Sequence, residues 1–146
     1  MFTFATDYFL LVFVSALGAI QIGASFGGLS GLLFLQAPKA ARALGTVLAV
    51  APFIWFFATG ERNINDYEGG LDANTQALFF FLGTLAAGGV TFVVSSAANW
   101  RMDGGAPAPE DGMDTLRSTT WARALAASLQ YWRKNWRRRT KQYFSG

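Results

Sequence analysis

The chain has 146 residues, of which 52% are hydrophobic and 14% charged, with a formal net charge of +3 and neither cysteine nor histidine. The lack of cysteine excludes disulfides and thiolate chemistry, and the lack of histidine removes the commonest metal ligand and the usual general base. Soluble domains average roughly 25% charged residues, so this composition indicates a membrane protein. We predict an all-α integral membrane protein, with three transmembrane helices in residues 1–98 and a C-terminal basic amphipathic helix.

The first predicted span is residues 8–36, a run of 29 residues without a charge. Such a helix would rise about 43 Å, longer than the hydrocarbon core of roughly 30 Å, so it must tilt, protrude or break near Gly27 and Gly28. The preceding segment, MFTFATD, is acidic where a signal peptide would be basic, so we expect the run to stay in the mature protein. Small residues recur at every fourth position, a pattern that lets another helix approach closely: Ser15, Ala19, Gly23, Gly27 and Gly31.

The second and third spans are predicted at residues 43–60 and 77–98. Pro38 is suited to open the second helix, and Asp72 or Asn74 to cap the third. Lys39 and Arg42 lie in the first loop, the second loop is acidic, and the C-terminal tail is basic. The positive-inside rule therefore predicts an external N-terminus and a cytoplasmic C-terminus.

The third span carries a second stripe of small or polar residues at four-residue spacing: Gly83, Ala87, Thr91, Ser95 and Asn99. The two stripes could pack against each other inside a three-helix bundle. Alternatively, at least one of them faces another subunit, a pigment or a lipid tail.

Residues 99–117 are rich in glycine, proline and acids and are predicted to be an irregular linker. Residues 118–146 follow, and residues 115–146 hold eight basic residues and no acid. A basic helix with a Trp/Leu face is typical of a segment that lies on an anionic membrane surface. The surface residues we expect are Trp121, Leu125, Trp132, Trp136, Arg133, Arg137 and Arg138. The tryptophans keep helical spacing, which argues against nucleic acid as the partner.

The predicted spans contain no Asp, Glu, Lys or Arg, which argues against ion transport by this chain alone. We find no nucleophile-and-base pair and predict no catalytic residue and no metal site. Gln21 is the strongly polar side chain at depth; it could bond another helix or a backbone carbonyl, or contact a quinone or pigment. The acidic second loop has oxygen ligands suited to Ca²⁺ but not the spacing of an EF-hand, so we expect it to dock on a neighbour.

Aromatic residues gather at the predicted external side in numbers beyond a usual interfacial belt. Together with polar residues of the spans they could contact bacteriochlorophyll, carotenoid or quinone. The residues we name for such contacts are Gln21, Phe13, Phe53, Trp55, Phe56, Phe80 and Asn99.

In outline, three spans with an external N-terminus in residues 1–98, the chain resembles the three-helix accessory subunits of bacterial photosynthetic reaction-centre–light-harvesting complexes. The resemblance covers architecture and carries over no family site. It implies a non-catalytic subunit of the bacterial inner membrane that stabilises an assembly of membrane subunits and aids quinone passage or pigment support. A respiratory accessory subunit, a small homo-oligomeric channel and a membrane scaffold are the alternatives.

Overall fold

The computed structural model describes residues 4–59, 72–102 and 112–144. Among these residues there is no strand, and the helices are α1 (Phe4–Gly27), η1 (Ser30–Leu32), α2 (Pro38–Ala58), α3 (Ala73–Ala98), η3 (Gly112–Arg117) and α4 (Trp121–Phe144). Three of them, α1, α2 and α3, are long and apolar enough to cross a membrane. At most 33% of the most apolar window of any of the three is buried within the chain, and most residues of α2 and α3 are exposed. This is the pattern of a multi-pass membrane protein.

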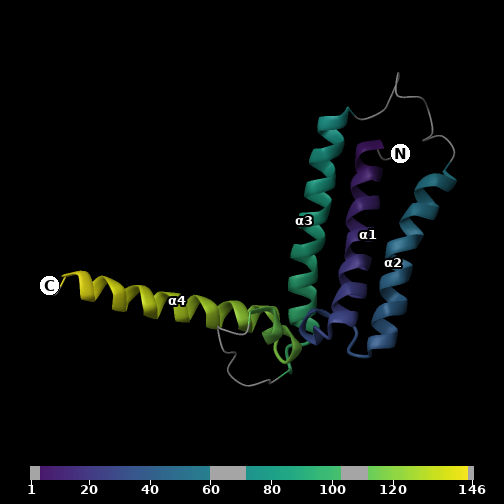
Figure 1. The fold of residues 1–146 in the computed structure, drawn as a ribbon. Coiled ribbons are helices and arrows are strands. Elements are labelled where there is room, and N and C mark those ends of the chain that lie inside the picture. The colour runs from purple at the N-terminus through teal and green to yellow at the C-terminus, as the bar shows by residue number, and fades with distance from the viewer. Residues whose placement is uncertain (1–3, 60–71, 103–111, 145–146) are drawn as a thin grey trace.

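The three long helices stand side by side with α1 in the middle (Figure 1). α1 packs against α2 on one side and against α3 on the other. The ends of α1 and α2 that the 28–37 connection joins lie at the same level as the end of α3 from which the chain continues to α4. α1 is therefore the central helix, and it joins α2 and α3 into one bundle.

The first span is shorter than the predicted 8–36, because α1 ends at Gly27. Gly28 adopts the left-handed conformation, with φ of 68°, and the amide of Leu29 donates to the carbonyl of Ala24 at 2.9 Å. This is a Schellman end, which favours glycine at the left-handed position. Of the three outcomes that the length mismatch allowed, the helix breaks near Gly27 and Gly28, and the apolar residues that follow form a folded connection instead of further α-helix.

The other helix starts follow the local signals in the sequence. Pro38 occupies the first turn of α2, which begins five residues before the predicted span. Asp72 caps α3, and its Oδ1 accepts the amide of Thr75 at 3.2 Å. α1 begins at Phe4, so Asp7 lies in its first turn, where a carboxylate is favourable to the helix dipole, and it is buried.

The linker is partly ordered, since η3 occupies residues that we expected to be irregular. Residues 103–111 and most of the acidic second loop, including the proposed Ca²⁺ ligands before Asp72, lie outside the described residues. α4 leaves the end of α3 and runs across the direction of the three long helices (Figure 1). A small core joins the 28–37 connection to this corner, formed by Ala24, Leu32, Leu33, Ala41 and Leu116.

Candidate interaction surfaces

Gln21 is fully buried and holds the 28–37 connection against α1. Its Nε2 donates to the carbonyl of Leu32 at 3.1 Å, and its Oε1 accepts the amide of Phe34 at 2.8 Å. The amide thus binds a backbone carbonyl, one of the two roles considered for it. Both ends of the side chain serve the chain itself, which leaves no exposed atom for a pigment or quinone.

Asn99, at the end of α3, holds the same connection from the other side. Its Nδ2 donates to the carbonyls of Leu33 at 2.7 Å and Ser30 at 3.2 Å, and its Oδ1 accepts from Nε2 of Gln36. The expected pigment contact is again replaced by a structural role. Two buried amides therefore satisfy backbone groups of an apolar segment that is helical only over η1.

The α1–α2 contact depends on a close approach of two glycines that the sequence patterns did not single out. A Cβ on Gly18 would lie 2.5 Å from the carbonyl oxygen of Gly45, and a Cβ on Gly45 would lie 2.9 Å from that of Gly18.

Near the 28–37 connection, Nε of Arg42 donates to Oγ of Ser25 at 3.0 Å, and the Arg42 guanidinium lies 4.3 Å from the ring centre of Phe26. A cation at this point is favourable to the C-terminal end of the α1 dipole.

The α3 stripe lies against α1. Four of its members within the helix are buried: Gly83, Ala87, Thr91 and Ser95. A Cβ on Gly83 would lie 3.2 Å from Cβ of Val12, which shows how closely the two helices approach. The small residues of this stripe therefore serve contacts inside the chain.

The α1 stripe does not pack against the α3 stripe, so the first of the two arrangements considered for the stripes is not the one found. Ala19, Gly23 and Gly27 are exposed, Ser15 is half-buried, and nothing lies within 4 Å of a Cβ built on Gly23. Gly31 is buried, but outside α1, where a Cβ would lie 2.9 Å from the carbonyl oxygen of Leu116. The reason is geometric: α1 turns its large residues, including Phe9 and Val12, toward α3.

The predicted aromatic contact residues lie on separate sides of α1. Phe53 and Trp55 belong to α2 and are exposed, as is Phe80 on α3, whereas Phe56 is buried and its ring lies 5.7 Å from that of Phe4. Phe13 is half-buried and stacks on Phe9. These rings do not gather into one shared site.

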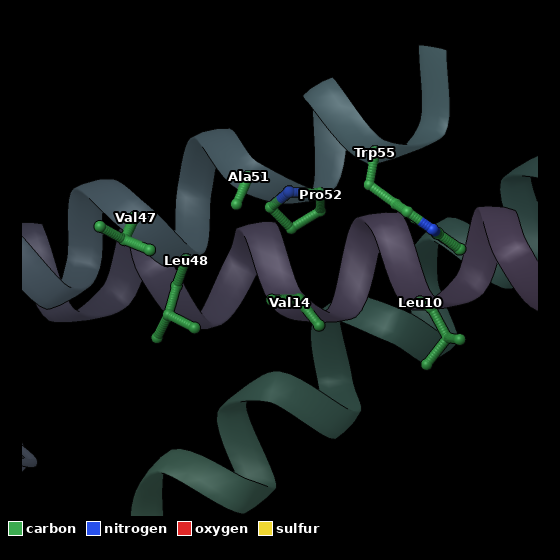
Figure 2. Close-up of a pocket in the computed structure, with 7 residues that line it drawn as sticks. All are labelled: Leu10, Val14, Val47, Leu48, Ala51, Pro52 and Trp55. Atoms are coloured by element: carbon green, nitrogen blue, oxygen red, sulfur yellow. The ribbon is translucent and has the colours of Figure 1, made fainter. Parts of the chain in front are cut away.

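An apolar groove of about 350 Å³ runs between α1 and α2. Figure 2 shows its lining, which is Leu10, Val14, Val47, Leu48, Ala51, Pro52 and Trp55. Trp55 is the predicted contact residue that lines it. Pro52 has no amide hydrogen, so it cannot donate to the carbonyl of Leu48 within α2.

On α4, four of the predicted membrane-surface residues beyond the first turn are exposed. Trp121 stacks on Phe92, whereas Leu125, Trp132, Trp136 and Arg133 are exposed. The side chains of Arg137 and Arg138 lie outside the described residues.

Among the described residues, no three Asp or Glu side chains come together as a metal site would require. Comparison of the chain with protein families, curated proteins and solved structures finds no match. The function is therefore inferred from the exposed surfaces of α1, α2, α3 and α4.

Proposed function

We propose that the chain is a non-catalytic accessory subunit that packs against other subunits of a larger membrane assembly. The observation that carries the proposal is the uncovered face of α1, where Ala19, Gly23 and Gly27 are exposed although α1 is the central helix. Small residues at four-residue spacing let a neighbouring backbone approach closely, which is the main source of helix association in lipid. In a chain without partner subunits, these exposed small residues would contribute little to helix packing.

The composition supports the non-catalytic part of the proposal. With neither histidine nor cysteine in the chain, the usual general base and the thiol nucleophile are missing. The buried polar groups Gln21 and Asn99 bind the chain's own backbone. These two side chains therefore stabilise the fold. The proposed role then depends on the surfaces through which the chain contacts other subunits.

For the host we propose an energy-converting complex of the bacterial inner membrane, and most specifically a photosynthetic reaction-centre–light-harvesting assembly. Support comes from the resemblance in architecture and from exposed rings on α2 and α3 that could contact carotenoid, bacteriochlorophyll or quinone: Phe53, Trp55, Phe57, Phe80 and Phe81. A respiratory complex is the alternative host.

The orientation we propose has the N-terminus outside and the C-terminus in the cytoplasm. Lys39 and Arg42, at the start of α2, and the basic helix α4 lie at the same end of the long helices (Figure 1). Positive charge at one end of the spans is what the positive-inside rule requires of the cytoplasmic side.

A homo-oligomeric channel lined by the α3 stripe is disfavoured by the structure. Its Gly83, Ala87, Thr91 and Ser95 are buried within one chain, so they are not available to line a pore between copies. A scaffold role for α4 remains compatible with the subunit proposal.

The test is purification from native membranes in a mild detergent, with identification of the co-purifying subunits and an absorption spectrum. We expect a stoichiometric complex, with pigment bands if the host is photosynthetic and haem bands of partner subunits if it is respiratory. Recovery of the chain as a colourless homo-oligomer would overturn the proposal.

A further inference from the structure

The first turn of α4 is fixed to the end of α3 by contacts of three kinds. The ring of Trp121 stacks on Phe92 with 4.5 Å between centroids and 17° between planes. The amide of Ala122 donates to Oγ of Ser96 at 3.3 Å. The guanidinium of Arg123 donates to the carbonyl of Trp100 at 3.0 Å and to that of Met102. These contacts set the direction in which α4 leaves the spans, which Figure 1 shows to run across them.

The stack on Phe92 also shows which face of α4 is turned toward the spans. Phe92 precedes the end of α3 at Ala98 by six residues, or about 9 Å of helix rise. Trp121 therefore points from α4 back along α3, toward the apolar part of the long helices.

The same face of α4 continues as an apolar surface. At 3.6 residues per turn, the following apolar side chains fall within about 80° of Trp121 around the helix axis. They are Leu125, Leu129, Trp132 and Trp136, which are 40%, 60%, 68% and 72% exposed. An exposed apolar face thus lies on the side of α4 that is turned toward the spans.

Most basic residues of α4 lie away from this face, except Arg139, which follows Trp121 by five full turns and falls on the same side. Arg123 and Lys134 fall on the opposite side of the helix from Trp121, and Arg133 at the boundary between the two faces. No acidic residue follows Asp114 in the chain. Lys39 and Arg42 add positive charge at the same end of the spans.

We propose that an anionic lipid leaflet covers this face. α4 lies flat at the surface where the spans leave the hydrocarbon, with Leu125, Leu129 and Trp132 among the acyl chains and the basic residues among lipid phosphates. Three observations favour lipid as the occupant: the apolar face turns toward the spans, the helix runs across them, and its charge is uniformly positive. Tryptophan and basic residues are the side chains that prefer this interfacial layer. The inference is independent of the proposed subunit role.

The test uses the full chain, whose lack of cysteine allows single-site spin labelling. Leu129→Cys places the label on the apolar face, and Gln130→Cys, its matched control, on the opposite face. The labelled proteins are reconstituted into vesicles of phosphatidylcholine, with or without phosphatidylglycerol. Collision with oxygen, which enters lipid, is compared with collision with a water-soluble nickel chelate.

With phosphatidylglycerol present, we expect the ratio of oxygen to nickel accessibility to be several-fold higher at position 129 than at 130. The contrast should shrink in phosphatidylcholine alone, because the attraction to anionic headgroups is then lost. Leu125→Cys and Ala126→Cys repeat the comparison one turn earlier, in case one substitution disturbs the helix.

Three results would overturn the proposal. Equal nickel accessibility at 129 and 130 would place α4 in water. Shielding of position 129 from both reagents would identify a protein surface as the occupant. An identical contrast in the two lipid compositions would remove the role of anionic headgroups.

Discussion

The two stripes of small residues, one on α1 and one on α3, have the same four-residue spacing and different surroundings. The α3 stripe is buried, with Ala87 0% exposed, whereas Ala19 and Gly23 on α1 are exposed. Val12 of α1 lies against the α3 stripe at Gly83, whereas nothing in the chain lies within 4 Å of a Cβ built on Gly23 of the α1 stripe. A small-residue stripe therefore identifies a face suited to close approach without identifying what approaches it.

The contacts of the α3 stripe with α1 stabilise the fold of the chain itself. The exposed part of the α1 stripe is instead available for contact with another subunit. Substitutions that remove a hydrogen bond or add bulk on the covered side of α1 or on the α3 stripe should lower the stability of the isolated chain. Substitutions at the exposed positions of the α1 stripe, such as Ala19 and Gly23, should leave that stability unchanged and affect association.

The largest loss is expected for Gln21→Leu on the covered side of α1. The substitution leaves the carbonyl of Leu32 and the amide of Phe34 buried without a partner, at about 1–3 kcal/mol for each group. We expect the free energy of unfolding, measured by denaturant titration in mixed micelles, to fall by about 3–4 kcal/mol. Gln76→Leu, at an exposed site of α3, should change it by less than about 0.5 kcal/mol. Equal effects of the two variants would contradict the role assigned to Gln21.

The next largest effect is expected for Gly18→Ala, at the close approach of α1 and α2. The added Cβ would meet backbone atoms of α2, including the carbonyl oxygen of Gly45 at 2.5 Å, and backbone cannot move aside as a side chain can. We expect a loss of about 3 kcal/mol in the same titration. Gly23→Ala is the matched control, because its Cβ meets nothing within 4 Å, and it should be neutral or slightly stabilising. A Gly18 variant as stable as the Gly23 variant would show that the helices do not approach closely there.

A direct comparison of the stripes uses Ala87→Leu and Ala19→Leu. Ala87 is fully buried against α1, so the larger side chain should cost about 2 kcal/mol by overpacking. Ala19 is exposed, so its variant should be as stable as the wild type yet recover fewer partner subunits after mild-detergent purification. The distinction between the stripes fails if the Ala19 variant unfolds like the Ala87 variant or retains its full set of partners.

The smallest effect is expected for Thr91→Val on the α3 stripe. The hydroxyl of Thr91 is buried and has no hydrogen-bond partner among the described residues. Replacing it by a methyl group of similar shape should leave the free energy of unfolding unchanged or raise it by up to about 1 kcal/mol. Thr84→Val, whose hydroxyl donates to the carbonyl of Phe80 at 2.9 Å, is the comparison. A marked loss at Thr91 would mean that its hydroxyl binds a group beyond the described residues.

Much of the fold could be predicted because it follows from local chemistry. The charge-free runs mark the spans, Pro38 opens α2, and Asp72 caps α3 through the amide of Thr75. The break at Gly27 and Gly28 was one of three outcomes that the length mismatch allowed, and the left-handed Gly28 decides among them. These features depend on a few adjacent residues, so the sequence pattern contains them.

The candidate site was less predictable, because its contacts join residues far apart in the chain. Gln21 and Asn99 looked available for a ligand, and their partners became visible only when the apolar 28–37 connection was found to fold back between them. Gly18 and Gly45 belong to no repeated pattern, since one crossing point needs one small residue on each helix. Periodicity likewise cannot tell the covered α3 stripe from the open α1 stripe.

The most direct test of the central claim is cross-linking from the α1 stripe in native membranes. A photoactivatable reagent is attached to Ala19→Cys, and to Leu85→Cys as a lipid-facing reference on α3, where the side chain is 71% exposed. We predict that irradiation joins the chain labelled at position 19 to a different protein subunit, while the reference reacts mainly with lipid. Lipid adducts alone at position 19 would contradict the claim that this face of α1 is covered by a partner subunit.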